Sequence, residues 1–333
     1  MNQHVRLYVL GACALALASG AAAGTDRPMA IRGQNPFTRV FGLPMYPAQQ
    51  PLAAGEWDGS AVLDIVNHAN VAAEGAEQVI LDGETYLFNL MATYAPTNTW
   101  QVGVDVPYVR YDGGFTDSGI EGWHDLWGFS NANRDGPRDQ LRIRYADQTT
   151  LYDIVEDNSG LGDLRLWSSF TFKQTPTTRL AVRATVKLPT GESDDLHGSG
   201  AADIALDVSI VHQLHAGKTR LSLSGHAGLL ALGDGDVLSQ RQENLVPYGG
   251  VGLVWALSDH WDLLTQIQAQ GSYFDSDLDE VGGSAVQISA GVRYCWARSN
   301  WELVVGFAED LVSDSTPDFA LRFELRKRYG KGS

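Results

Sequence analysis

The chain has 333 residues, a length that fits either two ordinary soluble domains or one β-barrel. Its formal net charge of −16 at pH 7 excludes nucleic acid as a partner, because phosphate groups require Lys and Arg. The two cysteines, Cys13 and Cys295, exclude a disulfide framework, and the sequence lacks the run of about 18 apolar residues that a membrane-spanning helix needs.

Residues 1–23 have the pattern of a cleaved signal peptide. Arg6 supplies a positive charge, an apolar stretch follows it, and Ala23 ends a run of small residues that suits a signal peptidase. We therefore expect export through the periplasm with cleavage after Ala23. A lipoprotein signal at Cys13 fits less well, because the apolar stretch ahead of that cysteine is too short.

Several stretches between residues 56 and 329 alternate between apolar and polar side chains. In one of them, Trp100, Val102 and Val104 are separated by Gln101 and Gly103, and the pattern recurs in 179–188, 204–210, 286–296 and 319–326. A period of two places the two sets on opposite faces of a β-strand. The stretches run for about ten residues, as a tilted strand needs to cross a bilayer, whereas globular strands average about five or six.

The connections alternate between short and long. Short turns are predicted at 96–98, 175–177, 216–218, 258–260 and 298–300, and long loops around 69–79, 112–160, 189–200, 233–244, 275–283 and 312–318. Within the longest loop, the stretches 139–147 and 150–156 suggest a small hairpin. The sequence thus predicts an all-β fold: a transmembrane, antiparallel, up-and-down β-barrel of about 12 strands in the outer membrane, with long extracellular loops and short periplasmic turns.

The barrel would span residues 56–329. Trp100, Trp261 and Trp301 follow three of the short turns, so we expect an aromatic belt at the membrane interface. Residues 24–55 are rich in Pro and Gln and lack alternation. They either sit in the periplasm or plug the lumen.

Charged side chains on the polar face of the strands would point into the lumen. The lumen-facing candidates are Asp105, Arg165, Lys173, Arg183, Lys187, Asp207, Arg293, Glu302, Arg322, Glu324 and Arg326. Since both signs are present, these groups either pair across the lumen and fill it, which we favour, or line a narrow aqueous path.

Two further patterns bear on chemistry. His197 and Ser199 lie two residues apart and would share a face of a strand, as in an outer-membrane lipid hydrolase, but glycines flank Ser199 and a tight turn explains them as well. The run 275–279 begins like a calcium loop and lacks its later glycine and glutamate. We therefore expect no metal site and no cofactor, and acidic loops solvated beside lipopolysaccharide and outer-membrane lipid.

Several motifs resemble an uncharacterised Gram-negative outer-membrane protein family, a domain of unknown function with the number 3187. They are Ile31-Arg32-Gly33-Gln34-Asn35-Pro36-Phe37, Gly42-Leu43-Pro44, Asp82-Gly83-Glu84, Gly160-Leu161-Gly162-Asp163, Lys187-Leu188-Pro189-Thr190-Gly191, and Gly198-Ser199-Gly200 with Asp203. Some of them are also distantly similar to barrels associated with aromatic-compound degradation. The resemblance implies an outer-membrane location and assigns no catalytic residues.

These observations favour a passive or weakly selective, porin-like channel for small solutes, without enzymatic activity. The alternatives are an outer-membrane lipid hydrolase that uses His197 and Ser199, and a structural barrel with a filled lumen.

Overall fold

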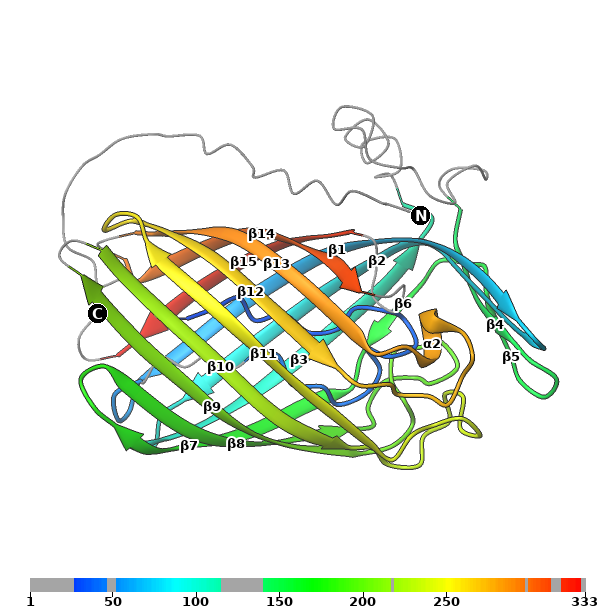
Figure 1. Cartoon of the computed structure of the whole chain (residues 1–333), viewed down its shortest axis with the longest axis horizontal. Helices are drawn as coiled ribbons and strands as arrows, with labels where there is room; N and C mark the ends of the chain where they lie inside the picture. Colours follow the sequence, from blue (N-terminus) through cyan, green and yellow to red (C-terminus); the bar gives the residue numbers. More distant parts are fainter. Residues whose placement is uncertain are drawn as a thin grey trace, which may run out of the picture.

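The computed structural model describes residues 27–46, 52–114, 140–216, 219–296, 299–312 and 319–330, so the predicted signal peptide lies outside the described part of the chain. Within these ranges, twelve long strands form one closed antiparallel barrel (Figure 1). They are β1 (Trp57–Glu74), β2 (Glu77–Tyr94), β3 (Trp100–Asp112), β7 (Leu164–Gln174), β8 (Thr178–Leu188), β9 (Asp203–Ala216), β10 (Thr219–Ala231), β11 (Leu245–Ala256), β12 (Trp261–Gln270), β13 (Ala285–Cys295), β14 (Trp301–Val312) and β15 (Phe319–Tyr329). Each pairs with the next, and β1 also pairs with β15. The predicted twelve-stranded fold is confirmed.

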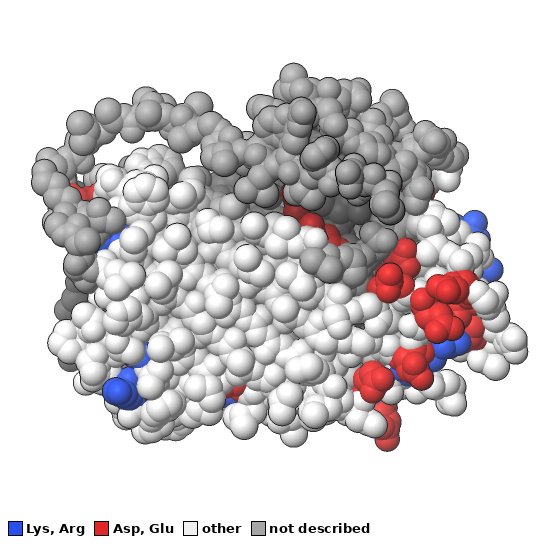
Figure 2. Space-filling model, in the orientation of Figure 1, with Lys and Arg blue, Asp and Glu red and all other residues white. Residues whose placement is uncertain are grey.

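Alternation along each strand separates an outer apolar face from an inner polar one. In β9, Leu206 and Val208 are 56% and 51% exposed, whereas Asp207 and Ser209 are 1% and 3% exposed. The outer side chains give the middle of the molecule an uncharged surface on the face shown in Figure 2, while acidic residues gather at the long-loop end. A closed barrel with such a band satisfies its backbone hydrogen bonds internally and meets lipid with apolar side chains.

The strands end and begin where the five short turns were predicted. The long loop predicted at 69–79 is wrong, because β1 and β2 continue until Glu74 pairs with Glu77. Gly75 lies between them with a φ of +59°, a conformation that glycine adopts without strain, so a two-residue turn joins the strands.

The outer end carries additional short elements. β4 (Arg142–Ala146) and β5 (Leu151–Ile154) form the predicted hairpin, and β4 pairs with the outer part of β2. β6 (Asn158–Leu161) pairs with β3. The hairpin and the ends of β1 and β2 project beyond the barrel in Figure 1, and one helical turn, α2 (Asp279–Gly282), lies between β12 and β13. No helix among the described residues is long and apolar enough to cross a bilayer.

Residues 27–46, which we name the lumen segment, run inside the barrel without regular secondary structure (dark blue in Figure 1). Nearly all of these residues are buried. At the loop end, Phe37 packs edge-on against Tyr145 and Tyr152, and Phe41 contacts Tyr273 and Phe274. The apolar core therefore lies at the loop end, between the lumen segment and the outer connections.

Candidate functional site: the lumen and its segment

The lumen segment enters at the short-turn end, reaches the loop end and returns. Arg27 donates to Asp58 near the start of β1 at 3.1 Å, and Phe37 lies among the aromatic rings of the loop end. On the return, the Tyr46 hydroxyl lies 3.0 Å from Ser224 Oγ in β10. The segment thus runs from the short-turn end to the loop end, and its return reaches the middle of β8 and β10.

Side chains of the barrel wall satisfy much of the segment's backbone. Gln266 accepts from Met29 N at 3.0 Å and donates to Met29 O at 3.1 Å. Further donations to carbonyl oxygens come from Arg293 to Arg27 (2.8 Å), Gln268 to Ile31 (3.1 Å), Lys187 to Val40 (3.0 Å), Arg165 to Phe41 (2.9 Å) and Arg183 to Met45 (3.0 Å). A coil buried in a lumen needs such partners, because its backbone N–H and C=O groups cannot form hydrogen bonds with water or with a neighbouring strand.

Lys187 is the centre of one cluster of buried charges. Its Nζ lies 2.7 Å from Asp163 Oδ2 and 3.1 Å from Asp203 Oδ2, and all three side chains are at most 1% exposed. Nζ also donates to Ser199 Oγ, and Asp203 Oδ2 accepts from Gly42 N at 2.8 Å. One ammonium group thereby joins β8, β9 and the lumen segment.

Asp163 holds the connection between β8 and β9 over this cluster. Its Oδ1 accepts from the backbone N–H groups of Thr190 and Gly191, both at 2.9 Å, and its Oδ2 accepts from Ser199 N at 3.1 Å. A Cβ at Gly198 would lie 2.3 Å from Asp163 Oδ1, so only glycine fits there without a shift. The motifs at 42–44, 160–163, 187–191 and 198–203 therefore meet around Lys187, and their contacts there hold the chain in place.

The contacts of His197 and Ser199 give the lipid hydrolase alternative no support. Ser199 is completely buried and its hydroxyl accepts from Lys187, while His197 Nε2 lies 2.8 Å from Asn158 Oδ1. Burial, followed by the positive charge of Arg39, lowers the pKa of His197 to about 4. A base directed at another residue and a hydroxyl closed off from substrate do not form a nucleophilic pair.

The structure places most of the lumen-facing candidates on the inner wall. Asp105, Arg165, Arg183, Lys187, Asp207, Arg293, Arg322, Glu324 and Arg326 are buried there, and Glu302 is partly buried. Lys173 needs correction, because it is exposed and follows a β-bulge after Thr171 that places it opposite Leu180. A bulge inserts one residue and changes the face on which the following side chains lie.

The charges pair along the wall and not across the lumen. Six ion pairs join residues that stand directly opposite each other on neighbouring strands: Asp64–Arg322 (3.6 Å), Asp105–Arg165 (3.8 Å), Arg183–Asp207 (2.9 Å), Lys187–Asp203 (3.1 Å), Asp262–Arg293 (2.7 Å) and Glu302–Arg326 (3.6 Å). They are cross-strand pairs on one face of a sheet. The lumen segment, with Arg32 donating to Asp105 at 2.8 Å, occupies the space between opposite walls.

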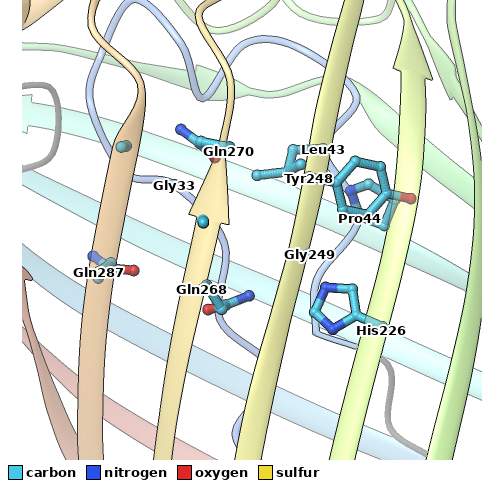
Figure 3. A pocket seen from close by; sticks show the side chains of 11 residues that line it. Gly33, Leu43, Pro44, His226, Tyr248, Gly249, Gln268, Gln270 and Gln287 are labelled. Carbon is cyan, nitrogen blue, oxygen red and sulfur yellow. The ribbon is translucent and has the colours of Figure 1, made fainter.

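Two spaces remain beside the segment. The first, which we name the inner chamber, has a cavity volume of about 80 Å³ and is lined by β15, β1, β2, β3, β7, β8 and β9 together with Met45 and Tyr46. The second, the side cavity of Figure 3, has a volume of about 20 Å³ and lies between Leu43, Pro44 and the wall of β10 to β13. Tyr46 packs edge-on against His226, with ring centroids 4.5 Å apart, where the two spaces approach each other.

Aromatic residues gather at the short-turn end of the outer face. Trp100 and Trp261 are 43% and 46% exposed, Trp301 is partly exposed, and each is the first residue of its strand. Lys327 lies 5.0 Å from the centre of the Trp301 ring. An interfacial belt at these three residues stays a prediction, which this placement favours.

The comparisons with known proteins agree with the fold. Residues 5–329 match the family model described as Protein of unknown function (DUF3187). The COG4313 outer membrane channel from Pseudomonas putida F1 is 13% identical with a TM-score of 0.55, over 85% of this chain and 99% of that one. The Ralstonia pickettii toluene transporter TbuX is 14% identical with a TM-score of 0.41, over 90% and 99% of the two chains. No curated protein matches the chain.

Proposed function

The chain belongs to the DUF3187 family, whose model matches nearly its whole length, and we propose that it is an outer-membrane channel for small solutes. The path we propose begins at the short-turn end in the inner chamber, passes the contact between Tyr46 and His226, and continues along the side cavity. The observation that carries the proposal is the inner chamber, a cavity of about 80 Å³ with a partly polar lining inside a closed transmembrane barrel.

The location follows from the outer surface. Strands of ten to eighteen residues, an apolar band and aromatic residues at one edge together suit a bilayer. Closed barrels of this kind with short turns on one side and longer loops on the other are the architecture of bacterial outer-membrane proteins. The structural similarity to an outer-membrane channel is a similarity of fold and supports the same location.

The return arm of the lumen segment separates the inner chamber from the side cavity, because Met45 and Tyr46 line the first and Leu43 and Pro44 the second. Residues 27–42 are held by many wall contacts, whereas the wall holds 43–46 through Arg183 on Met45 O and through Ser224 at the Tyr46 hydroxyl. Tyr46 N also donates to Ile31 O at 3.0 Å. A small displacement of Tyr46 away from His226 would join the chamber and the cavity without breaking the cluster around Lys187.

The test is solute flux through purified protein in liposomes. Replacing Tyr46 with Ala should increase the swelling rate with a small neutral sugar and the conductance in planar bilayers. Tyr108→Ala is the matched control, because Tyr108 lies on the outer face and is 42% exposed. Flux that is absent in the wild type and in both Tyr46→Ala and His226→Ala would overturn the proposal. That result would favour the structural barrel, for which the buried charges around Lys187 are the supporting observation.

A further inference from the structure

The inner chamber presents mainly positive charge. Four guanidinium groups line it, those of Arg27, Arg179, Arg183 and Arg326, against one carboxylate, that of Asp58. The four arginines come from the lumen segment, β8 and β15, so they lie on different sides of the chamber. Arg179, Thr93 and Gln101 are only partly buried and stand near strand ends, which opens the chamber at the short-turn end.

For Arg183 and Arg326, carboxylates outside the chamber lining supply neutralising charge. Asp207, which pairs with Arg183 at 2.9 Å, does not line the chamber, and neither do Glu324 and Glu302, which pair with Arg326. Asp58, by contrast, lines the chamber and lies 3.1 Å from Arg27 and 3.7 Å from Arg326. A solute in the chamber therefore meets four guanidinium groups and one carboxylate. Charge of one sign on the lining of a cleft with low-dielectric walls attracts ions of the opposite sign.

Two of the guanidinium groups retain hydrogen-bonding capacity. Arg27 and Arg326 are 4% and 3% exposed, and the Nε of each has no hydrogen-bond acceptor among the described residues, although Arg326 Nε lies 3.7 Å from Asp58 Oδ1. Both Nε atoms are closed off from the chamber, so an anion there would be attracted to these two arginines through their charge. Guanidinium groups match carboxylates best, because their N–H groups lie in the plane that a carboxylate can accept from.

The rest of the lining is apolar or neutral. Trp167, Met45, Met91 and Leu52 supply apolar surface, and Ser and Thr hydroxyls lie between them. Trp167 stands opposite Gly103 on β3. A Cβ at position 103 would lie 2.3 Å from the indole ring, so the glycine makes room for the ring against β3. Mixed apolar surface and guanidinium groups suit a ligand with a carboxylate at one end and an apolar body.

We propose that the inner chamber binds small organic carboxylates with an apolar body and makes the channel anion-selective. The proposal rests on the proposed channel function for its transport part, whereas binding in the chamber is measurable without any flux.

The first experiment is equilibrium dialysis of the detergent-solubilised protein against three probes of similar size and different charge: benzoate, benzamide and benzylammonium. Benzoate should bind at least about threefold more tightly than benzamide, and benzylammonium should bind weakest. Arg179→Gln should lower benzoate affinity by about threefold or more. Arg220→Gln should leave it unchanged, because Arg220 is paired with Asp259 at the same end of the barrel and does not line the chamber. Heat-modifiable migration on gels checks that each variant is folded.

The second experiment is the reversal potential across a KCl gradient in planar bilayers. Preference for chloride over potassium in the wild type, reduced in Arg179→Gln and kept in Arg220→Gln, is the expected result. Conductance with cation preference, or equal binding of benzoate and benzamide, would overturn the anion chamber and leave the channel standing. Absence of conductance with tight benzoate binding would overturn the channel and leave the anion chamber standing.

Discussion

Lys187 offers the sharpest test of how the lumen is held together. The change is Lys187→Met, which keeps the length of the side chain and removes its charge. Asp163 and Asp203 then remain buried without the ammonium group that lies 2.7 and 3.1 Å from them. Val40 O also loses its donor at 3.0 Å, which weakens the hold on the lumen segment.

The expected loss of unfolding free energy depends on the hydrogen bonds that the carboxylates of Asp163 and Asp203 keep. Removing one partner of a buried ion pair costs about 3–5 kcal/mol of unfolding free energy. Asp163 keeps three backbone N–H donors, and Asp203 keeps those of Gly42 and Gly233 at 2.8 and 3.0 Å, so the loss should lie near the lower end of that range. With a urea m-value of about 3 kcal/mol/M, a loss of about 3 kcal/mol lowers the unfolding midpoint by about 1 M. Adding Asp203→Asn removes one buried charge and should recover about half of the loss.

The assay is reversible urea unfolding from lipid vesicles, followed by tryptophan fluorescence. Lys327→Met is the matched control, because Lys327 is partly exposed beside Trp301 and Tyr329, and it should change the unfolding free energy by no more than about 1 kcal/mol. Equal losses for Lys187→Met and Lys327→Met would refute the reasoning. So would a double variant with Asp203→Asn that is less stable than Lys187→Met alone.

Three further predictions follow from the same structure. The pKa of His197 is lowered to about 4 from the ordinary 6.5, so its neutral form stabilises the fold above pH 6.5 and this contribution is lost as the pH falls toward 4. A titration by NMR should find the ring neutral at pH 5. His197→Gln should flatten the dependence of the unfolding midpoint on pH. Phe37→Ala should lower the unfolding free energy by about 3–5 kcal/mol, since the ring is completely buried against Tyr145 and Tyr152, and a urea midpoint like that of the wild type would contradict the packing. A protein with Trp100, Trp261 and Trp301 changed to Phe should lose much of its fluorescence quenching by lipids brominated near the headgroup, which tests the belt, whereas unchanged quenching would place the belt elsewhere.

The fold was predictable because its signal is periodic. Alternation and the sequence of short turns lead to twelve strands and to the correct face for Asp105, Arg183 and Asp207. The alternation predicts the wrong face for Lys173, because the sequence pattern does not show the β-bulge that precedes this residue. The first loop was predicted in place of a turn because Gly75 lies among small and polar residues that also suit a loop.

The site was less predictable, because it depends on which strands face each other. The alternation in β1 places Asp58 and Asp64 on the inner face, and that pattern was available in the sequence. Their partners were not, since Arg322 and Arg326 lie more than 250 positions away and meet β1 only when the barrel closes. The course of the lumen segment was also out of reach, because a coil carries no period and its contacts are with the backbone.

The width of the barrel explains why its interior combines a coil with paired charges. Side chains alone can fill a barrel of about eight strands, and twelve strands leave a wider lumen that needs further material or water. Gly291 and Gly306 stand directly opposite each other on β13 and β14, and a Cβ at either would come within 3.0 Å of Met29 Sδ, so the wall is hollowed where the segment packs. The lumen segment adds three arginines, Arg27, Arg32 and Arg39, and no acidic residue, and two of them pair with carboxylates of the wall, Arg27 with Asp58 and Arg32 with Asp105. Arg27 lines the inner chamber, where four guanidinium groups meet one carboxylate, so ion selectivity should originate there.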